Sequence, residues 1–136
     1  MAGYTIRNLK EVEDAAPKFG LAPDVEARFA RDALEAQSTG LSYQRLAPNV
    51  RQTFGHRHAE QEEIYVILGG SGRIKLDGDV VDVRPLDAVR MAPETMRCLE
   101  AGPDGLEVLA FSPRRGANDA EMTAGWWSSG LGRRAS

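Results

Sequence analysis

The stretch FGHRHAEQEEIYVILGGSGRIKLDG, residues 54–78, carries most of the information about the fold and the chemistry of this chain. It holds both histidines of the sequence, His56 and His58, separated by a single residue. Two adjacent glutamates, Glu62 and Glu63, follow, and then come an apolar run and a cluster of glycines. Side chains alternate between the two faces of an extended segment, so we expect both imidazoles on one face, together with Phe54.

Short apolar runs rich in β-branched and aromatic residues continue on both sides of this stretch, from residue 41 to about residue 111. Turn-forming segments separate these runs: APN, GGSG, DGD, RPLD, APE and AGPDG. Asp77-Gly78 is typical of a tight hairpin between RIKL and VVDV. Many short strands at regular spacing predict an all-β chain, folded as an antiparallel sandwich or barrel.

The first forty residues are less regular. Residues 4–9 fit a short strand, and Asn8 fits the cap of a helical turn that begins LKEVED. Residues 24–34 fit a helix capped by Asp24, and they fit equally one arm of a hairpin that returns into LSYQRL. The periodicity leaves both structures open.

The length, charge and composition of the chain exclude several kinds of protein. A chain of 136 residues suits one domain, and a net charge of −3 argues against nonspecific binding to nucleic acid. The single cysteine, Cys98, cannot form an internal disulfide, and we expect it to be a small buried apolar residue. No apolar run approaches the roughly 20 residues that span a bilayer, and the N-terminus lacks the apolar core of a signal peptide. These features predict a cytoplasmic protein that binds neither nucleic acid nor membranes.

The two histidines and one glutamate fit a metal site. Two imidazoles joined by a carboxylate from the next strand form a 2-His-1-carboxylate set, which suits Fe, Mn, Ni, Zn or Cu and leaves coordination positions open. Adjacent strand residues point to opposite faces, so only one of Glu62 and Glu63 can join the histidines. If Glu63 faces inward, Tyr65 shares that face.

The segment GHRHAEQEEIYVILGGSG resembles the first motif of the cupin superfamily, in which a glycine, His-x-His, a glutamate and a further glycine follow at set intervals. The resemblance favours Glu63 as the third ligand and Gly70-Ser71-Gly72 as a turn. It implies a double-stranded β-helix, or jelly-roll barrel, in a small single-domain cupin. It also implies a homodimer. The capping pattern at Asn8 adds the expectation of a short, partly helical N-terminal segment. We assign residues 1–40 to an N-terminal extension packing on the barrel, 41–113 to the barrel core and 114–136 to a C-terminal tail.

The second cupin motif is only partly present. It should end in a further metal-binding histidine, but in LDAVRMAPETMRCLEAG that place is taken by Arg97, and Ala92 and Glu94 stand where a proline and a glycine are expected. A guanidinium offers only hydrogen-bond donors and cannot replace an imidazole as a ligand. If Arg97 points inward, it either pairs with Glu63 in the place of the metal or holds an anionic ligand above a three-ligand metal.

Two functions remain open. In the first, a divalent metal on His56, His58 and Glu63 makes the protein an oxygenase, isomerase or lyase for a small polar or anionic substrate. In the second, the protein is a metal-free, noncatalytic ligand-binding or accessory cupin in which Arg97 replaces the metal. The candidates for contact with the small-molecule ligand are Arg97, Tyr43, Tyr65, Gln52 and Met91.

Beyond Pro113 the sequence is polar and glycine-rich apart from Trp126 and Trp127. We expect the two tryptophans to pack the tail on the barrel or on a second subunit. The final segment, SSGLGRRAS, is expected to be disordered.

Overall fold

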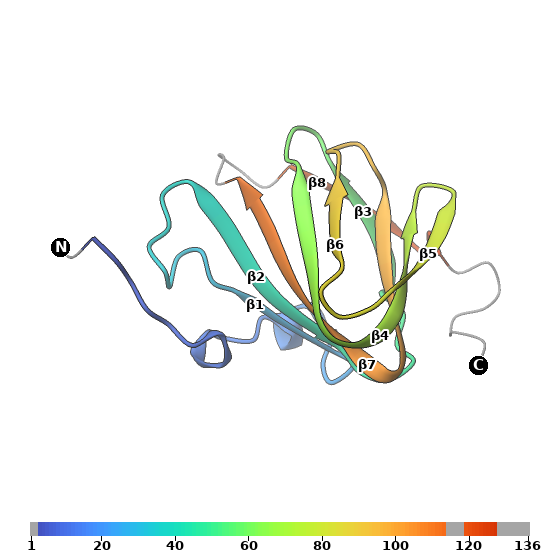
Figure 1. Cartoon of the computed structure of the whole chain (residues 1–136), viewed down its shortest axis with the longest axis horizontal. Coiled ribbons are helices and arrows are strands. Elements are labelled where there is room, and N and C mark those ends of the chain that lie inside the picture. Colours follow the sequence, from blue (N-terminus) through green and yellow to red (C-terminus); the bar gives the residue numbers. More distant parts are fainter. Residues whose placement is uncertain (1–2, 114–118, 128–136) are drawn as a thin grey trace.

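The computed structural model describes residues 3–113 and 119–127, most of which lie in antiparallel strands that curl into a barrel (Figure 1). In chain order the elements are the 3-10 turns η1 (Leu9–Glu11) and η2 (Ala16–Phe19) and the strands β1 (Val25–Phe29), β2 (Thr39–Leu46), β3 (Phe54–His58), β4 (Glu63–Leu76), β5 (Asp79–Val83), β6 (Ala88–Met91), β7 (Arg97–Pro113) and β8 (Ala120–Ala124). The all-β class and the barrel are therefore confirmed, and the helical part of the N-terminal segment is limited to the two 3-10 turns.

Two long strands, β4 and β7, run through both halves of the barrel. The first part of β4 pairs with the end of β7, and the second part of β4 pairs with the start of β7. In one half, β2 and β1 continue the sheet beyond β7, and β6 pairs with β4. In the other half, β3 and β8 continue it beyond β7, and β5 pairs with β4 across the two-residue turn at Asp77-Gly78. This arrangement turns inner side chains from both halves toward one another.

The glycine cluster bends β4 and does not end it. The strand continues from Glu63 to Leu76, with irregular register between Ile67 and Gly69 and again between Gly70 and Gly72. Gly70 has a φ of +81°, and a Cβ on it would lie only 2.0 Å from the carbonyl oxygen of Gly105. The expected turn at Gly70-Ser71-Gly72 is thus corrected to a bulged bend, which passes β4 from one half of the barrel to the other.

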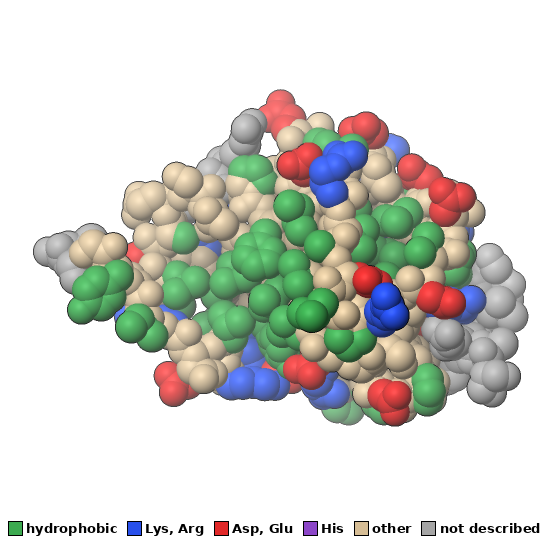
Figure 2. Space-filling view, viewed as in Figure 1, with side chains coloured by type: hydrophobic (Ala, Val, Ile, Leu, Met, Phe, Trp, Pro, Cys, Tyr) green, Lys and Arg blue, Asp and Glu red, His purple; other side chains and the backbone are tan. Residues whose placement is uncertain are grey.

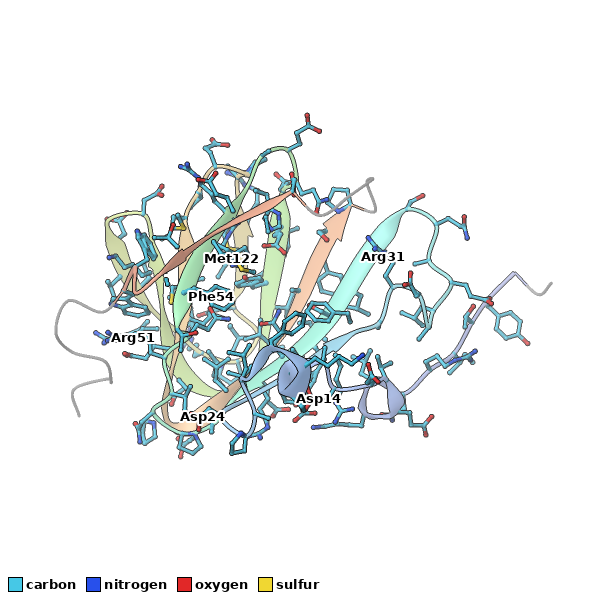
Figure 3. All side chains as sticks on the ribbon, turned by 180° about the vertical axis from the view of Figure 1, so that it is seen from behind. Asp14, Asp24, Arg31, Arg51, Phe54 and Met122 are labelled. Carbon is cyan, nitrogen blue, oxygen red and sulfur yellow. The ribbon has the colours of Figure 1, made fainter. Side chains whose placement is uncertain are left out.

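The N-terminal segment packs against β1, which is a strand. Residues 25–29 form a hairpin with β2, so the hairpin interpretation of residues 24–34 holds and the helix does not. Asp14, labelled in Figure 3 beside the turn η2, accepts hydrogen bonds from the backbone N–H groups of Ala16 and Ala27. Asn8 caps η1 by accepting from the Lys10 N–H, and residues 4–8 form no strand. The sheet therefore begins before residue 41.

The sheet also extends beyond residue 113. Strand β8 pairs with β3 along its whole length, from Phe54 opposite Ala124 to His58 opposite Ala120, so part of the expected C-terminal tail belongs to the barrel. Trp127 is buried on the barrel of its own chain, where the guanidinium of Arg51 lies 4.4 Å from its ring centre. The expected disorder of SSGLGRRAS concerns residues 128–136, which lie outside the described residues.

The core lies between the two halves of the barrel. Its buried apolar side chains are Ala16, Val25, Ala27, Leu46, Tyr65, Ile67, Ile74, Val83, Met91, Leu99, Ala101, Leu106, Val108 and Ala110. The outer face of the sheet formed by β2, β7 and β4 also carries many apolar side chains, which Figure 2 shows as a broad green area. Ile64 and Leu68 on this face are 38% and 42% exposed. Among the described residues, no helix has the length and apolar character needed to cross a membrane.

Candidate metal centre

Strands β3 and β4 bring three metal-binding side chains together. His56 and His58 lie two residues apart on β3, so the alternation of the strand places both rings on the same side. Glu63 opens β4 after the connection of residues 59–62, and its Oε1 lies 3.2 Å from Nε2 of His56 and 3.2 Å from Nε2 of His58. The two imidazole rings meet edge to face with their centres 5.2 Å apart.

The spacing of these three donor atoms suits a transition metal. Metal bonds of about 2.0–2.2 Å to imidazole nitrogen and carboxylate oxygen bring neighbouring donors roughly 3 Å apart. The donor atoms of His56, His58 and Glu63 all lie within 4.8 Å of one another. Within the described residues, Nε2 of His58 is buried and makes no well-aligned hydrogen bond, although Oε1 of Glu63 lies 3.2 Å away. Its lone pair is therefore available to an ion, and the set fits a 2-His-1-carboxylate centre.

The centre is partly open to solvent. The side chains of His56, His58 and Glu63 keep 15%, 8% and 13% of their surface exposed. Burial alone would raise the pKa of the Glu63 carboxyl, but the hydrogen bond with His56 and the close contact with His58 outweigh it and hold the pKa at about 2. The close contact with the Glu63 carboxylate raises the pKa of His58, burial opposes this, and the hydrogen bond with Asp119 raises it further. An ion binding here would meet an ionised carboxylate and would compete with a proton for Nε2 of His58.

Asp119 also contacts this centre. Its Oδ1 lies 2.7 Å from Nδ1 of His58, on the side of the ring that faces away from Glu63. The sequence analysis missed this residue because it lies 61 positions after His58, in a segment interpreted as tail. The neighbouring segment AEMTA has only one large apolar residue, Met122, so its alternation gives a weak strand signal.

Arg97 points into the barrel beside the three donors. It is fully buried, lies opposite His56 on the neighbouring strand, and places Nη1 3.7 Å from Oε1 of Glu63. Its Nε donates to the sulfur of Met91, and its Nη2 donates to the carbonyl of Ala92. The third nitrogen, Nη1, has no hydrogen-bond partner among residues 3–113 and 119–127. The bidentate fork to Glu63 that would fill the metal position is therefore not formed.

Two other candidate ligand contacts lie near the centre. Met91 is paired with Glu63 across β4 and β6, and it is 1% exposed. Tyr65 follows Glu63 by two residues on the same face and is 2% exposed. Both residues form part of the wall beneath the three donors.

Tyr43 and Gln52 lie elsewhere. Ala110 pairs with Tyr65 on one side and with Ser42 on the other, so Ser42 shares the inner face and Tyr43, the next residue, points outward. There its hydroxyl donates to Glu107. Gln52 uses its side-chain oxygen to accept from the backbone N–H of Leu99. These hydrogen bonds give both side chains a structural role, and their contact with a ligand stays a prediction.

The remaining polar candidates are separated from the centre by strand alternation. Glu62 points away from the histidines, has 53% of its side chain exposed and pairs with Arg90. Cys98 lies next to Arg97 and is fully buried, and burial raises the pKa of its thiol to about 12. At ordinary pH this thiol is protonated and is a poor nucleophile.

Comparisons with known sequences give a partial match. No family model matches the chain. An uncharacterised protein from Methanocaldococcus jannaschii is 33% identical over 79 residues, which is 57% of this chain and 63% of that protein, so the match spans less than two thirds of the relative.

Solved structures match over more of the chain. A cupin protein from Bacteroides fragilis has a TM-score of 0.69 and 24% identity, covering 86% of this chain and 89% of that chain. The polyketide cyclase RemF from Streptomyces resistomycificus has a TM-score of 0.70 and 17% identity, covering 92% and 87%. A predicted oxalate decarboxylase from Thermotoga maritima has a TM-score of 0.57 and 25% identity, covering 65% and 79%. The resemblance of residues 54–78 to a cupin motif is thereby confirmed at the level of the whole barrel, and the chain folds as a cupin.

Proposed function

We propose that His56, His58 and Glu63 bind a divalent transition metal, and that the protein acts on a small polar or anionic substrate held beside that metal. The observation that carries the proposal is the convergence of two Nε2 atoms on one carboxylate oxygen, at 3.2 Å each. Fe, Mn, Ni, Zn and Cu all accept such a donor set. A bound ion would supply Lewis-acid or oxygen-activating chemistry at the open coordination positions.

Arg97 supports an anionic or strongly polar substrate. Within the part of the chain that the structure describes, its Nη1 is a buried donor without a hydrogen-bond partner, 3.7 Å from Oε1 of Glu63. Buried donors carry a substantial free-energy cost unless they are satisfied, and a carboxylate or phosphate oxygen satisfies a guanidinium well. In this role Arg97 orients the substrate, while Met91 and Tyr65 form the apolar wall that limits its size.

The reaction class is an oxygenation, an isomerisation or a lyase reaction. Proteins of this fold include a polyketide cyclase and a predicted oxalate decarboxylase, so the fold is compatible with enzymatic roles but selects none of them. Lyase and isomerase reactions need a group that moves a proton. His56, His58 and Glu63 would be engaged as metal ligands, so the proton would have to be moved by another group of the protein or of the substrate.

The alternative function is a metal-free, noncatalytic ligand-binding or accessory protein. Its supporting observation is the complete burial of Arg97 close to Glu63, which places a fixed positive charge beside the position an ion would take. The gap of 3.7 Å and the lack of a bidentate contact favour the metal-binding function over this one.

Metal content tests the proposal. Protein purified without a histidine tag, and then incubated with Fe(II), Mn(II), Ni(II) or Zn(II), is expected to retain close to one equivalent of metal. His58→Ala should abolish retention, because it removes one of three donors. Glu62→Ala is the matched control, since it removes the adjacent, outward carboxylate and should leave metal content unchanged. Wild-type protein that retains none of the four metals would refute the proposal and favour the metal-free alternative.

A further inference from the structure

A single carboxylate links the C-terminal strand to the ligand-bearing part of the chain. Asp119 Oδ1 lies 2.7 Å from Nδ1 of His58, and Oδ2 accepts from the backbone N–H groups of Glu60 at 2.6 Å and Gln61 at 3.2 Å. The carbonyl of Asp119 accepts from the Ala59 N–H. Asp119 thus contacts both one ligand and the connection that leads to the next ligand, Glu63.

These contacts determine the orientation of the His58 ring. With Nδ1–H donating to Asp119, the other nitrogen, Nε2, faces Glu63 across 3.2 Å. Histidine ligands generally donate their second N–H to a carboxylate or carbonyl group, which fixes the tautomer and the ring orientation and makes the ligating nitrogen more basic. The backbone of His58 is held separately, because its N–H donates to the carbonyl of Pro93.

Strand β8 holds Asp119 in this place. The pairing of β8 with β3 runs to His58 opposite Ala120, so Asp119 directly follows the end of the ladder beside His58. Beyond the other end, the Gly125 N–H donates to the carbonyl of Thr53, and Arg51 Nη1 donates to the carbonyl of Trp127. In the rear view of Figure 3, the labelled Phe54 and Met122 mark the adjacent strands β3 and β8. The carboxylate is therefore supported by backbone bonds along the whole strand.

We propose that Asp119 is a positioning residue, which fixes His58 with Nδ1 protonated and Nε2 directed at the metal centre, and which also sets the path of residues 59–62 toward Glu63. The consequence for metal affinity rests on the proposed function. The consequence for the His58 ring does not, because the contact is made by this chain's own groups.

Two measurements separate these consequences. The first is a nitrogen-15 spectrum of the two histidines in metal-free protein, at a pH where the rings are neutral. Because the chain has two histidines, one His→Ala variant is enough to assign the ring signals to His56 and His58. Wild-type His58 is expected as the Nδ1–H tautomer, and Asp119→Ala should shift it toward the common Nε2–H tautomer. Asp119→Asn keeps an acceptor oxygen and should largely restore the wild-type spectrum.

The second measurement is the dissociation constant for Zn(II), by competition with a chelator. Loss of such an outer partner weakens binding by about 10- to 100-fold, so this loss is expected in Asp119→Ala, with a smaller loss in Asp119→Asn. Glu121→Ala is the control, because Glu121 lies two residues away and pairs outward with Arg57. A tautomer that is unchanged in Asp119→Ala would overturn the inference. Wild-type protein that binds no Zn(II) or other metal would refute the proposed function, while the spectrum would still decide the role of Asp119.

Discussion

Replacing Arg97 with methionine is expected to tighten metal binding. The change removes a positive charge that is fully buried and lies 3.7 Å from the one carboxylate of the centre. That charge opposes metal binding in two ways, because it repels a dication and because it competes with the ion for Glu63. Methionine has a similar length and is apolar, so it can pack against Met91 with little change in volume.

The expected gain in metal affinity follows from the distance between Nη1 of Arg97 and Oε1 of Glu63. Opposite unit charges 3.7 Å apart attract by about 4 kcal/mol at an effective dielectric constant near 20. Each 1.4 kcal/mol corresponds to a factor of ten in an equilibrium constant, so full release of Glu63 would strengthen metal binding by about 1,000-fold. Desolvation of the carboxylate already offsets part of this attraction. We therefore expect an increase in affinity between about 10- and 1,000-fold.

The assay is competition with a chelator of known affinity, using Zn(II) and Mn(II), on wild type, Arg97→Met and Arg90→Met. Arg90 is the matched control because it also loses one positive charge, but its side chain is 65% exposed and pairs with Glu62 outside the centre. Far-ultraviolet circular dichroism and a melting curve establish that each variant is folded. If Arg97→Met binds metal no more tightly than Arg90→Met does, then Arg97 does not compete with the ion, and the electrostatic argument is wrong.

Three further predictions concern other parts of the molecule. Hydrogen bonds from Lys10, Arg28 and Arg45 overcome the effect of burial and lower the pKa of Glu26 from 4.5 to about 2, so the stabilising contribution of this carboxylate is complete above pH 4.5 and is lost as the pH falls toward 2. The difference in melting temperature between wild type and Glu26→Gln should therefore shrink from pH 6 to pH 2.5, and a constant difference would contradict this. Gly70→Ala should lower the free energy of unfolding by more than about 1–3 kcal/mol, which is the cost of a left-handed residue alone, because the added Cβ would also lie 2.0 Å from the Gly105 carbonyl oxygen. A urea titration measures this loss, and Gly78→Ala is the control because no atom lies within 4 Å of its added Cβ. The homodimer implied by the cupin resemblance stays a prediction, and the exposed apolar face of β2, β7 and β4 is a suitable interface for it. Analytical ultracentrifugation should find a dimer that the variant Ile64→Asp dissociates, whereas a wild-type monomer at high micromolar concentration would exclude the dimer.

The candidate centre was predictable because its signal is local. His56, His58 and Glu63 lie within eight residues, so the alternation of a strand and one short connection are enough to bring them together. The inward position of Arg97 could be stated only as a condition, because it depends on the path of the segment before β7. The structure meets that condition, since Arg97 pairs with His56.

Residues whose position depends on distant pairing could not be placed from the sequence. The side on which Tyr43 lies is set by the register of β2 on β7, across more than sixty residues of chain, and a shift of one residue reverses it. Residues 25–29 carry both helical and strand patterns, and pairing with β2 decides between them. Asp119 gave no signal of its own, because its role depends on β8 lying beside β3.

The pairing of β8 with β3 also has a consequence during protein synthesis. Without β8, the strand that carries both histidines would have an exposed edge, and such edges recruit strands from other chains. Strand β3 joins the sheet through Arg97 at the start of β7, so this edge stays uncovered from the synthesis of residue 97 until β8 ends at residue 124, which takes roughly 1–5 seconds at about 5–20 residues per second. A nascent chain that stalls or is cleaved before residue 120 would keep its edge open, and we expect such fragments to aggregate more readily than the full chain.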